Sequence, residues 1–216
     1  MPMPPADTQQ SREIADKFTR EHYGLRYLLA SHPIMRRLKR KQRSQLHGNK
    51  NWGAAFLLME YLQTAPLEQA SKILEVGCGW GLGSLFCVKR FHCDALATDG
   101  DPAVFPFLNA QAAANGLTLT TEPRRFESFP TEELGRFDTL IASDICFWDD
   151  MAEEVYRMIE RAIHGGCGRI IIADLGRPPF LDVAEACVED FYADIHPITA
   201  NSQRQHRGWI LNIENR

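Results

Sequence analysis

Glycines at alternating positions, next to an acidic residue, form the most chemically informative stretch of this 216-residue sequence. Residues 71–84 read SKILEVGCGWGLGS, so an apolar run over 72–76 is followed by glycine at 77, 79 and 81. Glycine allows a tight turn and lets a ligand approach the backbone closely. The stretch therefore predicts a ligand-binding loop between a buried strand and a helix, here called the glycine loop (77–81). Its predicted binding residues are Glu75, Gly77, Cys78, Gly79 and Gly81.

A second acidic residue stands where a nucleoside ligand would need it. Asp99, followed by Gly100, ends the next apolar run, 94–98, and lies 22 residues after Gly77. A carboxylate in that place can accept hydrogen bonds from both hydroxyls of a ribose. A nicotinamide cofactor and an adenosyl cofactor would both use it, but a dinucleotide loop of the GxGxxG type needs a third glycine where this sequence has Leu82. The glycine spacing therefore disfavours an NAD-dependent oxidoreductase, which stays open as the alternative.

The elements that would position these residues follow from the pattern after residue 71. Short apolar runs alternate with stretches of helical periodicity, which is typical of a doubly wound, mostly parallel α/β sheet. The last two runs are joined by a polar link, so they predict an antiparallel hairpin. The expected strands cover 72–76, 94–98, 117–126, 137–143, 169–175, 193–197 and 208–213. Helices are expected over 52–63, from 82 to about 90, and over 101–115, 150–163 and 181–192.

The N-terminal part of the chain differs in charge from the rest. Residues 1–50 hold 11 Lys and Arg against 4 Asp and Glu, whereas residues 51–216 hold 13 against 24. Helices are expected over 11–31 and 33–43, and six of the eight residues in 36–43 are basic. We predict two parts: a basic helical extension over 1–50, outside the core on the substrate side, and a ligand-binding domain over 51–216.

Composition excludes several classes of protein. With 44% hydrophobic and 24% charged residues the chain is too apolar for disorder. No apolar run is long enough to span a bilayer, and the N-terminus does not resemble a signal peptide. The six cysteines form no CxxC pair, so free thiols in a reducing, cytoplasmic setting are expected. No residue spacing suggests a metal site.

The stretch ILEVGCGWG followed by ATDGDP resembles the S-adenosylmethionine site of class I methyltransferases, over residues 70–175. The resemblance implies a seven-stranded sheet ending in an antiparallel hairpin, as the strand pattern also predicts. It implies that the glycine loop passes under the methionine part of S-adenosylmethionine and that Asp99 binds the ribose. It implies, finally, that Glu127 and Ser128 flank the adenine.

The same resemblance places the methyl acceptor at the end of the fourth expected strand, beside Asp144. LIASDICF is similar to the xxSDxxY motif of the methyltransferase 16 group of protein-lysine methyltransferases, and NWGAAFLLMEYL to that group's W-x-A-A helix. The group's tyrosine is Phe147 here, so lysine as the acceptor stays open beside a small-molecule amine. We predict Asp144 and Phe147 as catalytic residues. The carboxylate can orient an amine and stabilise its developing positive charge, and Phe147 can form part of an aromatic wall around a cationic or planar acceptor. Trp52 is expected to border the cofactor pocket.

The methyl acceptor is the expected partner, and the basic segment 36–43 raises RNA as an alternative acceptor. RNA is not favoured, because no aromatic residue interleaves the basic cluster and the body is acidic. A solvated helix face that packs against this acidic body is the simpler interpretation of 36–43. Arg177 is expected to be a solvated arginine, with a substrate contact as the alternative. A non-catalytic adenosyl-binding or RNA-binding module remains a third alternative for the protein.

Overall fold

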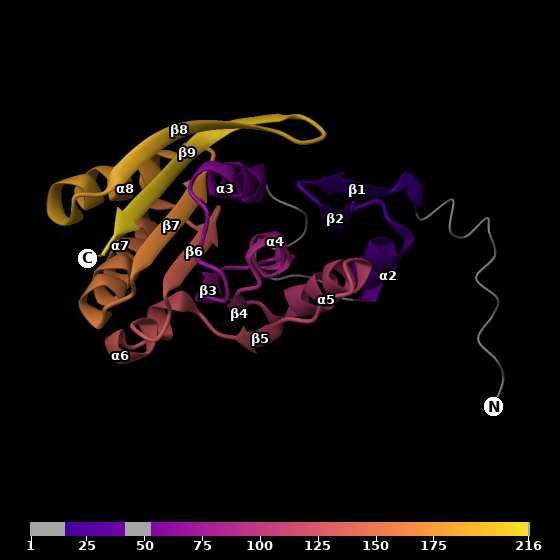
Figure 1. The fold of residues 1–216 in the computed structure, drawn as a ribbon, viewed down its shortest axis with the longest axis horizontal. Helices are drawn as coiled ribbons and strands as arrows, with labels where there is room; N and C mark the ends of the chain where they lie inside the picture. Colours follow the sequence, from indigo (N-terminus) through magenta and orange to yellow (C-terminus); the bar gives the residue numbers. More distant parts are fainter. Residues whose placement is uncertain (1–15, 42–52, 216) are drawn as a thin grey trace.

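The computed structural model describes residues 16–41 and 53–215, and it is built around a seven-stranded sheet of order β5-β4-β3-β6-β7-β9-β8 (Figure 1). The strands from β5 to β7 run parallel, whereas β9 is antiparallel to both of its neighbours. The strands are β3 Lys72–Val76, β4 Asp94–Asp99, β5 Thr120–Pro123, β6 Thr139–Ser143, β7 Arg169–Asp174, β8 Asp194–Asn201 and β9 Gln205–Glu214. The predicted doubly wound sheet with its C-terminal hairpin is therefore confirmed.

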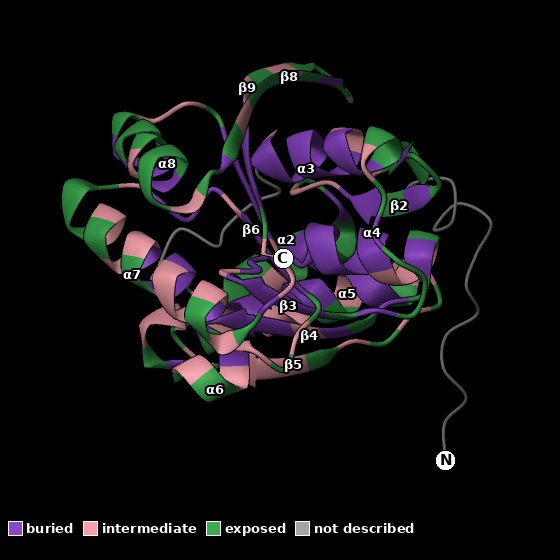
Figure 2. Ribbon diagram, turned by 60° about the vertical axis from the view of Figure 1, so that its left-hand side comes forward, coloured by how far each residue is buried: buried purple, intermediate pink, exposed green. Residues whose placement is uncertain are grey.

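Helices cover both faces of this sheet (Figures 1 and 2). The long helices fall where helical periodicity predicts them, whereas the single-turn α6 and two 3₁₀ turns were not predicted, because such short pieces carry no periodicity. The helices are α2 Pro33–Lys41, α3 Gly53–Thr64, α4 Leu82–Phe91, α5 Phe105–Ala114, α6 Thr131–Leu134, α7 Asp149–Gly165 and α8 Pro178–Phe191. The 3₁₀ turns are η1 Pro102–Val104 and η2 Phe126–Ser128.

Alternation along the central strands explains the two-sided core. Ile73 of β3 and Ile141 of β6 belong to the cluster formed with α3 and α4. Their neighbours Leu74 and Ala142 belong to the cluster formed with α7 and α8 on the other side. Successive side chains of a strand point to opposite faces, so a strand covered by helices on both faces must be apolar throughout. This is why the central strands appear in the sequence as continuous apolar runs.

The helix expected over 11–31 is wrong for residues 19–28. This stretch forms an antiparallel hairpin of β1 (Thr19–His22) and β2 (Leu25–Leu28). Tyr23 and Gly24, the two residues of the turn, both have positive φ, at 47° and 78°. Positive φ at two successive residues is what a two-residue hairpin turn of type I′ requires. A right-handed helix cannot continue through such a turn, so the segment forms a hairpin. The second expected helix is confirmed as α2, as far as Lys41.

Side-chain amides of α5 bind the exposed edge of β2. Gln111, which is fully buried, donates from Nε2 to the Leu28 carbonyl at 3.0 Å and accepts from the Leu28 amide at 2.7 Å. One turn later, Asn115 makes the same two contacts with the backbone of Arg26, at 2.7 and 2.9 Å. Leu25 of the hairpin is fully buried and belongs to the same cluster as α3 and α4. The expectation that residues 1–50 lie outside the core is therefore wrong for the hairpin.

Three general features complete the fold. All six cysteines are buried free thiols, as predicted. Within residues 16–41 and 53–215 no group of three or more His, Cys, Asp or Glu could hold a metal ion. Among the helices that the structure describes, none is both long and apolar enough to cross a membrane.

Candidate methyl-transfer site

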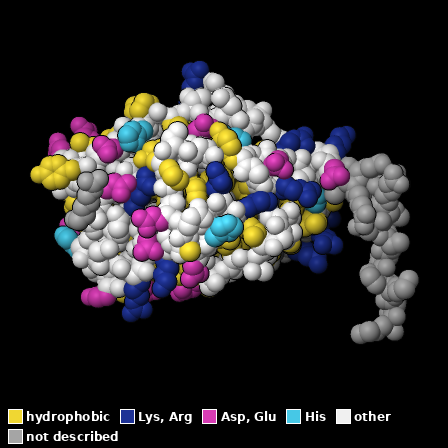
Figure 3. All heavy atoms as spheres, viewed as in Figure 1, with side chains coloured by type: hydrophobic (Ala, Val, Ile, Leu, Met, Phe, Trp, Pro, Cys, Tyr) yellow, Lys and Arg dark blue, Asp and Glu magenta, His cyan; other side chains and the backbone are white. Residues whose placement is uncertain are grey.

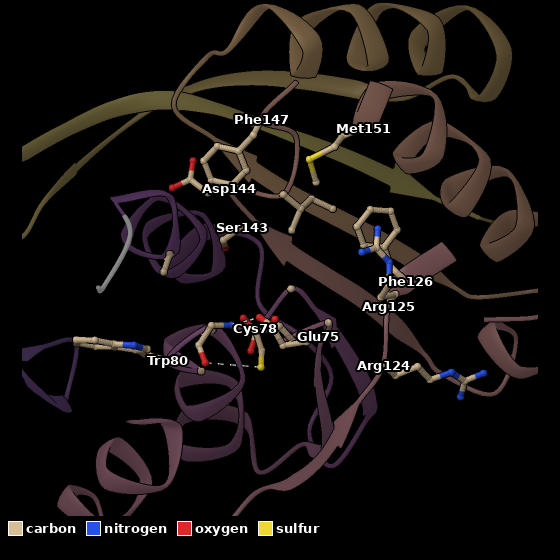
Figure 4. A pocket seen from close by; sticks show the side chains of 18 of the residues that line it. Glu75, Cys78, Trp80, Arg124, Arg125, Phe126, Ser143, Asp144, Phe147 and Met151 are labelled. Atoms are coloured by element: carbon tan, nitrogen blue, oxygen red, sulfur yellow. Dashed lines mark hydrogen bonds between the residues drawn. The ribbon is translucent and has the colours of Figure 1, made fainter. Parts of the chain in front are cut away.

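A pocket of about 300 Å³ lies at the carboxyl ends of β3, β4 and β6 (Figure 4). Most of the predicted site residues lie along it: Glu75, the glycine loop, Asp99, Gly100, Glu127, Asp144 and Phe147. Ser128 does not line the pocket, and Trp52 lies outside the described residues. In Figure 4, Asp144 and Phe147 stand at one end, while Arg124 and Arg125 stand at the other.

The glycine loop is held in a backbone conformation that favours glycine. Gly79 and Gly81 have φ of 51° and 72°. A Cβ added at Gly81 would lie 2.6 Å from the side chain of Leu108, whereas one at Gly79 would meet no protein atom within 4 Å. Glycine is therefore needed at position 81 to avoid a clash with Leu108. At position 79 the missing side chain leaves the backbone accessible to a ligand in the pocket.

Asp99 fastens this loop from the next strand. Its Oδ2 accepts from the Gly79 amide at 2.9 Å and its Oδ1 accepts from the Asp101 amide at 2.8 Å. Only 8% of the residue is exposed, and burial raises the pKa of its carboxyl above the ordinary value, against the two backbone hydrogen bonds. A carboxylate offers about four lone-pair positions, so two remain for a ligand. Asp101 caps the following turn by accepting from the Ala103 amide at 3.0 Å.

Glu75 is buried beneath the start of α4. Its Oε2 accepts from the Ser84 amide at 3.0 Å and from the Ser84 hydroxyl at 2.6 Å. Burial raises the pKa of this carboxyl to about 7, and the Ser84 hydrogen bonds oppose the shift. A side chain at position 83 would collide with the Glu75 carboxylate, which explains the extra glycine there. Glu75 therefore connects the end of β3 to the start of α4 and lines the pocket as well.

The 3₁₀ turn η2 forms the far wall. Glu127 lines the pocket; its Oε1 accepts from Arg125 at 2.5 Å, while its Oε2 is buried without a partner in the structure. Ser128 instead donates from its hydroxyl to the Arg125 carbonyl at 2.7 Å, so it serves the local turn. Phe126 also lines the pocket and was not predicted. The sequence indicates this role for Phe126 only in that it is an apolar residue next to the predicted Glu127.

Asp144 lies in a strained position at the end of β6. Its φ is 55°, which is uncommon for a non-glycine residue, and its amide donates to the Ala173 carbonyl at 2.9 Å. The residue is 4% exposed. Its Oδ1 accepts a hydrogen bond from Arg177, but its Oδ2 is buried with no partner. Ser143, directly before it in the pocket wall, also has a buried hydroxyl without a partner.

Arg177 is not the solvated side chain that was expected. Its Nη1 donates to Asp144 Oδ1 and, at 2.7 Å, to Asp174 Oδ2. Its guanidinium carbon lies 4.4 Å from the centre of the Phe147 ring. Burial lowers the pKa of Arg177, but the two carboxylates outweigh it and the pKa is raised. One arginine therefore joins the ends of β6 and β7 and covers one face of Phe147, a link that no sequence spacing reveals.

Comparisons with known proteins agree with this geometry. Residues 73–166 match a family model described as a methyltransferase domain. The electron transfer flavoprotein beta subunit lysine methyltransferase of Rattus norvegicus is 24% identical over 130 residues, which are 60% of this chain and 50% of that protein. The chain thus spans about half the length of this curated relative.

Solved structures show the same fold. TrmK of M. capricolum, in complex with S-adenosyl-homocysteine, superposes with a TM-score of 0.55 at 12% identity, over 76% of this chain and 69% of that one. TrmN of Thermus thermophilus gives 0.53 at 14% identity, over 74% and 48%. The segment that matches the family model and the fold shared with these structures both agree with a methyltransferase domain of the class I, S-adenosylmethionine-dependent type.

Proposed function

We propose that this protein transfers the methyl group of S-adenosylmethionine to an amine on a protein side chain, held beside Asp144. The residues of the pocket fit that cofactor. The pocket volume is at the lower end of the range for small-molecule sites. Gly79 leaves backbone open to a ligand, and the buried carboxylate of Asp99 keeps acceptor capacity for a ribose.

Cofactor contacts are proposed for the residues that line this part of the pocket. Asp99 would accept the ribose hydroxyls, and the glycine loop with Glu75 would lie against the methionine part. The unpartnered Oε2 of Glu127 is an acceptor for the amino group of an adenine, and Phe126 offers an apolar wall. No cofactor contact is proposed for Ser128, because its hydroxyl donates to the Arg125 carbonyl within the same turn.

The main support for an amine acceptor is that the buried Oδ2 of Asp144 has no hydrogen-bond partner in the structure. A buried carboxylate oxygen without a donor costs free energy, so its presence beside a pocket indicates a donor on the ligand. An amine supplies such a donor. Asp144 and Asp174 also share a single guanidinium, so the cluster keeps one net negative charge when both are ionised. That charge favours an acceptor on which positive charge develops.

The chain's own residues have little covalent work to do. S-adenosylmethionine supplies an activated methyl group on its sulfonium, so the protein must mainly orient the acceptor and exclude water. Asp144 Oδ2 would accept an N–H of the amine and stabilise the charge that develops on nitrogen. Phe147 would act through shape, because its ring has no hydrogen-bonding group and one face is covered by Arg177. A protein amine is favoured over a metabolite because the rat relative is a lysine methyltransferase.

Two matched amide variants test the assignment. Asp99→Asn should weaken binding of S-adenosylmethionine, measured by titration calorimetry, by about 10- to 100-fold. Asp144→Asn should bind S-adenosylmethionine within about threefold of the wild type and lose most methyl transfer. Equal loss of binding in both variants would assign Asp144 a structural role, and wild-type protein that binds NAD but not S-adenosylmethionine would refute the proposal.

The acceptor class needs a separate experiment. Fractionated lysate incubated with S-adenosylmethionine carrying a labelled methyl group should acquire label in protein. Label on nitrogen survives mild alkali, whereas label on a carboxyl group is lost as methanol. Alkali-stable label in protein supports the proposal. Label confined to RNA or to small metabolites contradicts it.

A further inference from the structure

Helix α2 exposes five basic side chains that form no ion pair with any described residue: Arg36, Arg37, Lys39, Arg40 and Lys41. Arg36 and Arg40 are four residues apart, as are Arg37 and Lys41, so each pair lies along one side of the helix. Like charges at this spacing destabilise a helix. The first turn of α2 carries no acidic residue to offset the repulsion. The helix dipole favours the cations of the last turn, Lys39, Arg40 and Lys41, but not those nearer the start of the helix. Helix stability therefore does not explain Arg36 and Arg37.

The inner side of α2 is fixed by apolar contacts. Met35 is fully buried and packs in a small cluster with Leu28, Trp80 and Phe107. Phe107 belongs to α5, against which α2 lies (Figure 1), and α5 contains no acidic residue. The expectation that the basic face packs against the acidic body is therefore wrong for residues 33–41. Arg36, Arg37, Arg40 and Lys41 are exposed on a helix whose inner side is packed, in the region where Figure 3 shows Lys and Arg gathered.

One side chain separates this basic face from the pocket. Trp80, in the glycine loop, lines the pocket and stacks on Phe107 with 5.1 Å between ring centres. Lys39 Nζ of α2 lies 5.4 Å from the centre of a Trp80 ring. A ligand held on α2 would thus lie next to the wall of the methyl-transfer pocket.

We propose that the basic face of α2 (Arg36, Arg37, Lys39, Arg40 and Lys41) docks an acidic segment of the protein that is methylated. This inference rests on the proposed function, because it assigns the pocket's acceptor to a protein. Ile34 supports a peptide as the occupant, since it is 39% exposed and lies one turn before Arg37 on the same side of the helix. An apolar side chain beside cations fits a peptide with acidic and apolar residues. Among these described positions of α2 no aromatic side chain is available to stack on a base.

The test uses two variants of equal charge change. Arg36→Glu/Arg40→Glu reverses two charges on α2, whereas Arg136→Glu/Arg157→Glu reverses two exposed charges near α6 and on α7. Fluorescence anisotropy reports binding of a labelled peptide of Glu and Leu residues and, separately, of a labelled single-stranded RNA. We expect the α2 variant to bind the peptide about tenfold or more weakly, the control variant to match the wild type, and added salt to weaken wild-type binding.

Each other outcome has a distinct meaning. No peptide binding by the wild type, or equal losses in the two variants, overturns the docking surface. RNA that binds more tightly than the peptide, and that the α2 variant releases, assigns the face to nucleic acid and overturns the peptide. Arg36→Gln/Arg40→Gln keeps the test valid if the Glu variant fails to fold. Calorimetry with S-adenosylmethionine on the same wild-type protein tests the proposed function independently, because it does not depend on α2.

Discussion

The guanidinium of Arg177 donates a hydrogen bond to the carboxylate of Asp144, across the ends of β6 and β7. The same nitrogen binds Asp174, whose Oδ1 accepts from the amides of Gly176 and Arg177, each at 2.8 Å. Arg177 is therefore oriented before it reaches Asp144. Asp144 has a positive φ, and a non-glycine residue keeps this backbone conformation only where its surroundings hold it. The hydrogen bond from Arg177 therefore helps to fix the position of the Asp144 carboxylate.

Replacing Arg177 should therefore slow methyl transfer without weakening cofactor binding. Arg177→Met leaves two buried carboxylates without their shared cation, and we expect transfer at saturating S-adenosylmethionine to fall by about 100-fold. The acid limb of the pH–rate profile should move to higher pH, because Arg177 opposes the rise that burial causes in the pKa of Asp174 and the variant lacks that opposition. Arg177→Lys keeps the charge but not the planar fork and should lose less. An unchanged profile in Arg177→Met would contradict the positioning role.

Gly79 and Gly116 offer a matched test of where the cofactor lies. Both have positive φ, at 51° and 66°, and an added Cβ meets no protein atom within 4 Å at either. Alanine should therefore lower the free energy of unfolding by about 1 kcal/mol at each site. Only Gly79→Ala should weaken binding of S-adenosylmethionine in calorimetry. Comparable affinity in the two variants would place the cofactor away from the glycine loop.

The buried carboxyl of Glu75 makes stability depend on pH. Because burial raises its folded pKa from 4.5 to about 7, the folded state binds this proton more tightly than the unfolded state. The free energy of unfolding should therefore fall as pH rises through that window, by of order 3 kcal/mol, and stay level above it. Urea denaturation at several pH values measures the slope. Glu75→Gln should remove most of it, whereas Glu68→Gln, at an exposed position, should leave it intact.

Docking of the N-terminal hairpin depends on Gln111. Its amide satisfies both backbone groups of Leu28 in a fully buried place. Gln111→Ala removes both hydrogen bonds to Leu28 and opens a cavity, so the free energy of unfolding should fall by about 2–4 kcal/mol. Asn109→Ala, an exposed amide on the same helix, should change stability by less than about 0.5 kcal/mol. Urea denaturation of both variants makes the comparison, and equal effects would show that the hairpin is not held through Gln111.

The sequence by itself determined the features that have a periodic or local cause. Strands buried on both faces must be apolar throughout, so 72–76 and 169–175 could be recognised directly. Glycine at 81 is dictated by local backbone geometry and by the nearby Leu108, and Asp101 by its cap. Those constraints operate within a few residues or recur at a fixed period, and a single sequence displays them.

Tertiary structure decided what depends on contacts between distant segments. The hairpin over 19–28 replaces a helix partly because Gln111 and Asn115, more than 80 residues away, bind its edge. Arg177 looks solvated in the sequence and becomes a bridge only when β6 and β7 lie side by side. The basic residues of α2 lie near the pocket because Lys39 contacts Trp80, which lines it. No local sequence pattern predicts these contacts, because each joins residues of different elements that come together only when the chain folds.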